Sequence, residues 1–260
     1  MIESLTTGGV KCDFMGREEF LALCHGRLVG RDFTHIVTLN PEMVMLAQRN
    51  TSFAQALAGA TWRIPDGSGL IWARWYLRSQ FWSLWPSLLA FPFIHVERIT
   101  GVDAVLSLSE IAEREKKHVY LLGGTPYQVT RTATLLRKKY PTLQVTSSPA
   151  HTFDLAGPSA ILDDIKAKQP DIIFVAYGAP LQTEWIARHG QTLSSVRLAM
   201  GVGGAFSILS EDTPRAPAFL RRLNLEWLWR LVLEPSRIPR IWQATIRFPL
   251  LVHSQKKMGG

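Results

Sequence analysis

One carboxylate, Asp66, occupies a turn whose residue types suit catalysis, Pro65-Asp66-Gly67-Ser68-Gly69. A short apolar segment, 61–64, precedes the turn, and the residues from Leu70 onward are typical of the start of a helix. Proline and two glycines form a tight turn in which the backbone can approach a ligand closely. Asp66 is therefore either the N-cap of the following helix or a general base, and the turn alone favours the cap.

A second polar group ends the β-branched run 35–40. Thr38 and Asn40 lie at the carboxyl end of this predicted strand, and Pro41 follows as the first residue of a predicted helix. Ligands of open parallel sheets bind at the carboxyl ends of the strands. Asn40 therefore has two interpretations, a helix cap and a binding residue.

Two further stretches could bind anions. Arg98 stands just before a predicted helix whose start is marked by Thr100 and Asp103 at the spacing of a shortened capping box. A cation there strengthens an anion-attracting helix N-terminus, although Arg98 could also be a plain surface charge. The cluster Gly201-Val202-Gly203-Gly204 lacks the third spaced glycine and the acidic residue of a dinucleotide fingerprint, but its glycines could let the backbone approach a nucleotide phosphate.

The elements that position these residues alternate between strand and helix. The apolar runs 119–124, 171–177 and 196–200 are predicted strands, and helical patterns of ordinary length separate them. Gln182 belongs to the helix that follows the turn Gly178-Ala179-Pro180. This alternation predicts an α/β fold, a Rossmann-like parallel sheet covered by helices.

Composition narrows the class of protein. The 260 residues are 47% hydrophobic and only 19% charged. Cys12 and Cys24 lack metal-ligand spacing and are interpreted as reduced core thiols. The first ten residues lack the basic and apolar regions of a signal peptide, which favours the cytoplasm.

The positive charge is concentrated at the end of the chain. Residues 214–260 carry nine lysines and arginines against two glutamates, a net +7 of the chain's +8. We therefore divide the chain into a catalytic domain, 1–213, and a basic, aromatic helical appendage, 214–260. Such a tail attracts an anionic partner: phosphates, a membrane surface or nucleic acid.

Two helices are predicted in this appendage. The first is predicted over 218–233. Opposite charges recur along it at four-residue spacing and can pair with one another: Arg222, Glu226, Arg230 and Glu234. The second covers 237–252 and is typical of an interfacial helix. Its predicted apolar face holds Ile238, Ile241, Trp242 and Thr245, with Arg240 and Arg247 opposite.

An aromatic segment, Trp75 to Phe93, interrupts the α/β pattern. Its uncharged part, 79–96, is near the lower length limit of a membrane span and contains Pro86 and Pro92. The segment is therefore interpreted as either a contact at the membrane interface or a hydrophobic lid.

Several of these patterns, in this order, resemble one family. They are Thr38-Leu39-Asn40, the Asp66 turn, Arg98-Ile99-Thr100-Gly101-Val102-Asp103, Gly178-Ala179-Pro180-Leu181-Gln182, Gly201-Val202-Gly203-Gly204-Ala205-Phe206, Arg215-Ala216-Pro217 and Glu226-Trp227-Leu228-Trp229-Arg230. Together they are similar to the WecG/TagA/CpsF glycosyltransferases, classified as GT26. The resemblance covers roughly residues 34–240.

The resemblance implies an inverting, metal-independent glycosyltransferase that moves a sugar from a UDP-sugar to a polyprenyl-diphosphate-linked saccharide. It implies peripheral attachment to the cytoplasmic face of the membrane, no nucleic-acid partner and no cofactor, since the UDP-sugar is a substrate. It makes Asp66 the general base. The substrate-binding residues that it suggests are Thr38, Asn40, Arg98, Asp103, Gln182, Gly201, Gly203, Arg215, Arg222 and Arg230.

The chemistry agrees with this assignment. A sugar hydroxyl is a poor nucleophile, so a carboxylate that accepts its proton is useful. The sequence has no Asp-x-Asp metal motif, so guanidinium groups and helix N-termini would balance the leaving diphosphate. Thr183 and Ser207 replace carboxylates of the family pattern, and the aromatic segment is longer than usual. The donor could therefore carry N-acetylmannosamine, its uronic acid or glucose.

Two other functions are compatible with the sequence. A nucleotide-dependent oxidoreductase would use the Gly201 turn, and a catalytically dead membrane-bound assembly protein would keep only the binding surface. The sequence leaves open whether the chain forms a homo-oligomer.

Overall fold

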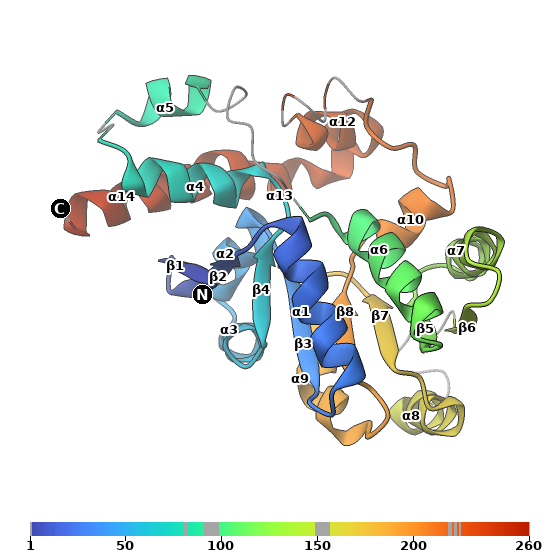
Figure 1. The fold of residues 1–260 in the computed structure, drawn as a ribbon. Helices are drawn as coiled ribbons and strands as arrows, with labels where there is room; N and C mark the ends of the chain where they lie inside the picture. Colours follow the sequence, from blue (N-terminus) through green and yellow to red (C-terminus); the bar gives the residue numbers. More distant parts are fainter. Residues whose placement is uncertain are drawn as a thin grey trace.

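A parallel sheet of six strands forms the centre of the protein (Figure 1). The computed structural model describes residues 2–80, 83–90, 99–148, 157–217, 220, 223 and 225–259. The strand order is β4-β3-β8-β7-β5-β6, and every neighbouring pair is parallel. The strands are β3 (Thr34–Leu39), β4 (Trp62–Pro65), β5 (His118–Gly123), β6 (Gln144–Ser148), β7 (Ile172–Ala176) and β8 (Leu198–Gly201). The predicted Rossmann-like α/β fold is confirmed.

Helices cover both faces of the sheet (Figure 1). One face packs against α1 (Arg17–Val29), α6 (Gly101–Arg114), α7 (Pro126–Lys139) and α10 (Ala205–Leu209). The other face packs against α8 (Gly157–Lys168) and α9 (Leu181–His189). Strand residues alternate between the two layers: Ile172 and Phe174 face the first, and Ile173 and Val175 face the second. This period of two explains why the buried strands read as continuous apolar runs.

A third apolar cluster lies beside the first strands. It joins β3 to α2 (Pro41–Ala47), α3 (Thr51–Ala58), α4 (Ser68–Arg78) and an N-terminal hairpin, β1 (Glu3–Thr7) and β2 (Val10–Phe14). Sequence analysis missed the hairpin. The signal was present, since Gly8-Gly9 turns at positive φ and Val10, Cys12 and Phe14 alternate inward. Cys12 and Cys24 are free and buried, as predicted, and burial raises the pKa of both thiols.

The end of the chain returns to this cluster. A helical stretch consists of α13 (Ile238–Trp242), a π-helical turn (Gln243–Arg247) and α14 (Phe248–Gly259), and it lies along α4 (Figure 1). Phe248 and Val252 are fully buried among residues of the N-terminal half, including Trp72 and Tyr76 of α4. The division of the chain at residue 213 stays a prediction, but α14 packs into the same core as β3.

The helix predicted over 218–233 differs from the structure. Among the described residues, Leu223 lies in a turn and α12 (Glu226–Leu233) begins only after Leu225. Pro235 follows the helix end as predicted. Glu234 lies beyond that end and forms an ion pair with Arg237 at 2.6 Å, so it does not extend the predicted charge stripe.

Only part of the aromatic segment is described. Trp72 and Tyr76 of α4 stack on each other inside the core, and α5 (Leu84–Ala90) follows with Trp85 exposed. Phe81, Trp82 and residues 91–98 lie outside the described residues. No helix in the described ranges is long and apolar enough to cross a membrane.

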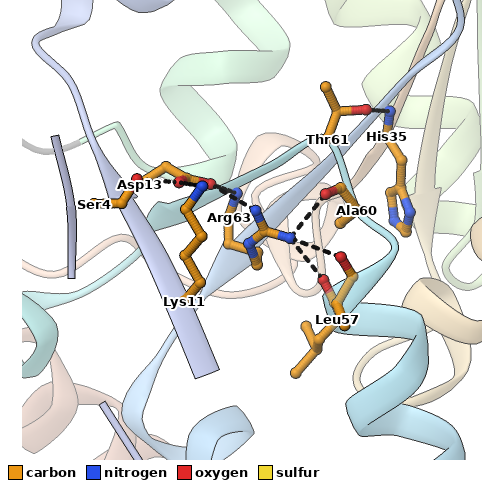
Figure 2. Close-up of polar contacts among 9 residues, drawn as sticks. Ser4, Lys11, Asp13, His35, Leu57, Ala60, Thr61 and Arg63 are labelled. Carbon is orange, nitrogen blue, oxygen red and sulfur yellow. Dashed lines mark hydrogen bonds and ion pairs between the residues drawn. The ribbon is translucent and has the colours of Figure 1, made fainter. Parts of the chain in front are cut away.

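A buried ion pair fastens the hairpin to the sheet (Figure 2). Asp13 of β2 accepts hydrogen bonds from the backbone N–H of Arg63 at 2.9 Å and from its guanidinium at 3.1 Å. The guanidinium also donates to three carbonyl groups at the end of α3: Leu57, Ala58 and Ala60. Burial alone would raise the pKa of Asp13, but the hydrogen bonds from the Arg63 backbone N–H and the Ser4 hydroxyl, together with the charges of Arg63 and Lys11, lower it below its ordinary value.

Replacing Asp13 therefore tests how the hairpin is held. Asp13→Ala leaves the Arg63 charge buried without its carboxylate, and we expect the free energy of unfolding to fall by about 3–5 kcal/mol. Lys11→Ala is the control, because Lys11 is an exposed partner of Asp13 at 3.4 Å and its loss costs under about 1 kcal/mol. Urea unfolding measures both, and equal losses would contradict this interpretation.

The lowered pKa adds a pH dependence to the same measurement. A carboxyl whose folded-state pKa is depressed stabilises the fold above its ordinary pKa, near 3.8, and loses that contribution as the pH falls through the folded-state value. The wild type should lose this stabilisation in acid, whereas Asp13→Ala has none to lose.

Candidate active site

A cavity of about 540 Å³ opens at the carboxyl ends of β3, β4, β7 and β8. The C-terminal helices form its opposite wall, with residues from Leu223 to Pro249 among the lining. Six of the predicted site residues line this one cavity: Thr38, Asn40, Asp66, Gln182, Gly203 and Arg215. The structure therefore brings together residues that are up to 177 positions apart in the sequence.

The Asp66 turn is fixed by its backbone. The N–H of Asp66 donates to the carbonyl of Leu39 at 2.7 Å, which continues the pairing of β4 with β3. The interpretation of Asp66 as helix cap is wrong, because Gly67 occupies the N-cap position of α4. Gly67 has φ +105°, a conformation that residues with a Cβ atom rarely adopt. Asp66 lies just before the helix and lines the cavity.

Gly69 lets α4 approach α2. A Cβ atom at position 69 would lie 2.5 Å from Cγ of Pro41. The first turn of α4 therefore packs directly on the first turn of α2. This contact holds the Asp66 turn next to Asn40.

Thr38 and Asn40 contribute different groups. The Thr38 hydroxyl is buried and donates to the carbonyl of Gly201 at 2.9 Å, which joins the ends of β3 and β8. Asn40 is the N-cap of α2, since its Oδ1 accepts from the N–H of Met43 at 2.9 Å. Within the described residues its Nδ2 makes no hydrogen bond, so a donor remains for a ligand. Capping and ligand contact are thus compatible at Asn40.

Gln182 holds two turns together. Its Oε1 accepts hydrogen bonds from the N–H groups of Gly178, at 3.1 Å, and Gly203, at 3.0 Å. Its side chain packs on Gly201, where a Cβ atom would lie 2.6 Å from Nε2. Gly201 does not line the cavity, and its small size makes room for Gln182.

Arg215 comes from the chain after α10 and is held by the start of α6. Its guanidinium donates to Oδ1 of Asp103 at 3.0 Å. Oδ2 of Asp103 accepts from the Thr100 hydroxyl at 2.7 Å, and Thr100 caps α6 as the sequence predicted. Asp103 does not line the cavity, so it acts on the site through Arg215.

Three predicted binding residues have no described side chain. Arg98 and Arg222 lie outside the described residues, and Arg230 belongs to α12 without a described side-chain placement. Their assignments stay predictions.

Sequence analysis missed two arginines at the cavity, Arg237 and Arg240. The helical pattern from 237 onward contained the signal, but Arg240 was expected on the face opposite Ile241 and Thr245. That expectation is wrong, because Arg240, Ile241 and Thr245 all line the cavity. Ile238 and Trp242 of the predicted apolar face do not line the cavity and are exposed.

The two positions where the family pattern has a carboxylate, Thr183 and Ser207, are not part of the cavity wall. Thr183 is buried and Ser207 donates to the carbonyl of Gly204, and neither lines the cavity. The two departures from the family pattern therefore leave the cavity wall itself unchanged. In the described part of the chain, no cluster of three or more His, Cys, Asp and Glu residues could hold a metal ion.

Comparison with known proteins places the chain in a family. A sequence model of the glycosyl transferase WecG/TagA/CpsF family matches residues 5–259. An enzyme of Bacillus spizizenii named N-acetylglucosaminyldiphosphoundecaprenol N-acetyl-beta-D-mannosaminyltransferase is 29% identical over 218 residues, covering 84% of this chain and 76% of the relative. A Staphylococcus aureus enzyme of the same name is 29% identical over 223 residues, covering 86% of this chain and 81% of the relative. The cavity with Asp66 at its wall therefore belongs to an enzyme of the WecG/TagA/CpsF family of glycosyltransferases.

Proposed function

We propose that this enzyme transfers a sugar from a UDP-sugar to a saccharide linked to a polyprenyl diphosphate, with inversion at the anomeric carbon. The observation that carries the proposal is the composition of the cavity wall. Two carboxylates, Asp66 and Glu42, share the cavity with three arginines, Arg215, Arg237 and Arg240, in a chain of this family, and Glu42 is the ion-pair partner of Arg240. A base for the acceptor hydroxyl and cations for the diphosphate groups are what transfer from a nucleoside diphosphate to a lipid-linked diphosphate needs.

The reaction is a single displacement. The acceptor hydroxyl oxygen attacks the anomeric carbon while its proton moves to Asp66, and the bond from that carbon to the UDP oxygen breaks. Attack opposite to the departing UDP inverts the anomeric configuration. Negative charge grows on the diphosphate, and guanidinium groups stabilise it without a metal ion.

The polar residues around Asp66 suit the donor. The free amide nitrogen of Asn40 can donate to a sugar or nucleotide oxygen. Gln182 keeps the turns at Gly178 and Gly203 in place, so that the backbone approaches the nucleotide closely. Asp103 orients Arg215 for the diphosphate through a hydrogen bond of 3.0 Å.

The relatives suggest the substrates. Their names specify N-acetylmannosaminyl transfer to N-acetylglucosaminyl-diphosphoundecaprenol. Thr183 and Ser207 do not line the cavity, so they give no reason to expect a different sugar here. We therefore propose N-acetylmannosamine as the first donor to test, with its uronic acid and glucose as the other members of the screen. The family assignment favours this reaction over nucleotide-dependent oxidation.

Asp66→Asn tests the proposed base. Loss of a general base lowers the rate about 10²–10⁴-fold, and the conservative change leaves the turn intact. UDP affinity should stay within about twofold, because the base acts on the acceptor hydroxyl. Initial rates and calorimetric UDP binding measure the two effects, with Asp32→Asn, an exposed carboxylate outside the cavity, as the control. Full transfer by Asp66→Asn would show that the assignment of Asp66 as the general base is wrong. An inactive wild type would favour the alternative of a catalytically dead assembly protein.

We further propose that the enzyme binds peripherally to the cytoplasmic face of the membrane. Exposed large apolar residues gather on α5, α12, α13 and α14, and Figure 1 places α5, α12 and α13 at the same end of the molecule. They are Trp85, Trp227, Leu228, Val232, Leu233, Ile238, Trp242 and Leu250. Arginines on the same segments add attraction to anionic lipid.

Deleting the C-terminal helices would be a poor test, because Phe248 and Val252 belong to the core. The double change Ile238→Ser and Trp242→Ser instead removes two exposed apolar groups, and we expect sedimentation with phosphatidylglycerol vesicles to fall about tenfold or more. Val29→Ser is the control, since Val29 is equally exposed but lies near the amino ends of the strands. Unchanged sedimentation of the double variant would shift the membrane contact to another segment.

A further inference from the structure

One face of the C-terminal helical stretch belongs to the cavity. The residues that line it recur at intervals of three and four, the spacing of one helix face. They include Arg237, Arg240, Ile241, Ala244, Thr245 and Phe248. The cationic end of this face is formed by Arg237 and Arg240, and its apolar end reaches the buried core at Phe248.

The same helix has an apolar outer side. Ile238 is 58% exposed and Trp242 is 56% exposed, and neither lines the cavity. Ile238 directly follows Arg237, and Trp242 comes two residues after Arg240. Cavity-lining arginines and exposed apolar side chains thus alternate along one short helical stretch, 237–242.

Both arginines have carboxylate partners that a phosphate could replace. Arg237 pairs with Glu234 at 2.6 Å, and Arg240 pairs with Glu42 of α2 at 3.4 Å. The Arg240 side chain is more than half exposed, and exposed ion pairs are weak. A diphosphate offers more oxygen atoms to the guanidinium fork than one carboxylate does.

The reaction proposed above involves two diphosphates, one in the UDP-sugar donor and one in the polyprenyl-linked acceptor. The cavity has cations on two separate elements. Arg215 is held against α6 by Asp103, whereas Arg240 is held against α2 by Glu42. An exposed apolar helix side accompanies Arg237 and Arg240. A lipid-linked diphosphate lies where its chain enters the bilayer, so it needs cations next to an apolar surface.

We propose that Arg237 and Arg240 bind the diphosphate of the lipid-linked acceptor, while Ile238 and Trp242 face its polyprenyl chain and the lipid around it. The identity of this ligand rests on the proposed function. The donor diphosphate belongs to Arg215, so the two diphosphates enter one cavity from different sides.

Equilibrium binding tests the assignment without any transfer reaction. The probes are farnesyl diphosphate, as a short polyprenyl diphosphate, farnesyl monophosphate and UDP, each titrated into the full-length chain by calorimetry. The double change Arg237→Ala and Arg240→Ala should weaken farnesyl diphosphate binding about tenfold to a hundredfold, because charge-assisted hydrogen bonds are lost. It should also remove the preference for the diphosphate over the monophosphate, and UDP affinity should change less than about twofold.

Arg247→Ala is the matched control, since Arg247 is exposed on the same helical stretch but does not line the cavity. Circular dichroism and the unchanged UDP affinity verify that each variant folds. The proposal is overturned if UDP binding weakens instead, if Arg247→Ala has the same effect, or if the wild type does not bind farnesyl diphosphate. A wild type that binds the diphosphate through these arginines but transfers no sugar would contradict the proposed function and leave this site standing.

Discussion

The contact between the Asp66 turn and the end of β3 determines the geometry of the site. The N–H of Asp66 bonds to the carbonyl of Leu39, and Gly69 allows α4 to pack on Pro41. These short-range contacts place a carboxylate beside Asn40 at the carboxyl edge of a parallel sheet. The backbone thus holds position 66 at the wall of the cavity.

The cations of the cavity come from the other end of the chain. Phe248 and Val252 are buried in the cluster that contains Trp72 and Tyr76, so the C-terminal helices are anchored along α4. The cations that precede this anchor then form the wall opposite Asp66. Asp66, the proposed base, is held by the sheet, and arginines held by the last helices lie across the cavity from it. The exposed apolar side of the same helices is consistent with the lipid-linked substrate that we propose.

Sequence reasoning predicted the features that depend on local patterns. The buried strands, the Asn-Pro start of α2 and the cap at Thr100 were predictable because neighbouring residues determine them. Thr38 and Asn40 were predictable as binding residues because ligands bind at the carboxyl ends of parallel strands, whereas Gln182, Gly203 and Arg215 were predicted from the family resemblance. The role of Gly67 as N-cap was not, since it depends on a backbone conformation rather than on residue type.

The features that sequence reasoning missed depend on long-range packing. The position of Arg240 at the cavity follows from how the last helices dock on α2 and α4, which periodicity alone does not specify. The interruption of the helix at Leu225 was also missed, because the apolar pattern of the sequence continues through that position. The Asp13–Arg63 pair joins residues 50 positions apart, and each looks like an ordinary surface charge in the sequence.

The central claim is that this cavity transfers a sugar from UDP to a lipid-linked saccharide with inversion. The most direct measurement combines the full-length enzyme with UDP-N-acetylmannosamine and a short-chain N-acetylglucosaminyl-diphospholipid, and analyses the product by mass spectrometry and NMR. The account predicts a disaccharide lipid, equimolar UDP and an anomeric configuration opposite to that of the donor, with EDTA present. A product that retains the donor configuration, or release of UDP with no lipid-linked disaccharide, would contradict it.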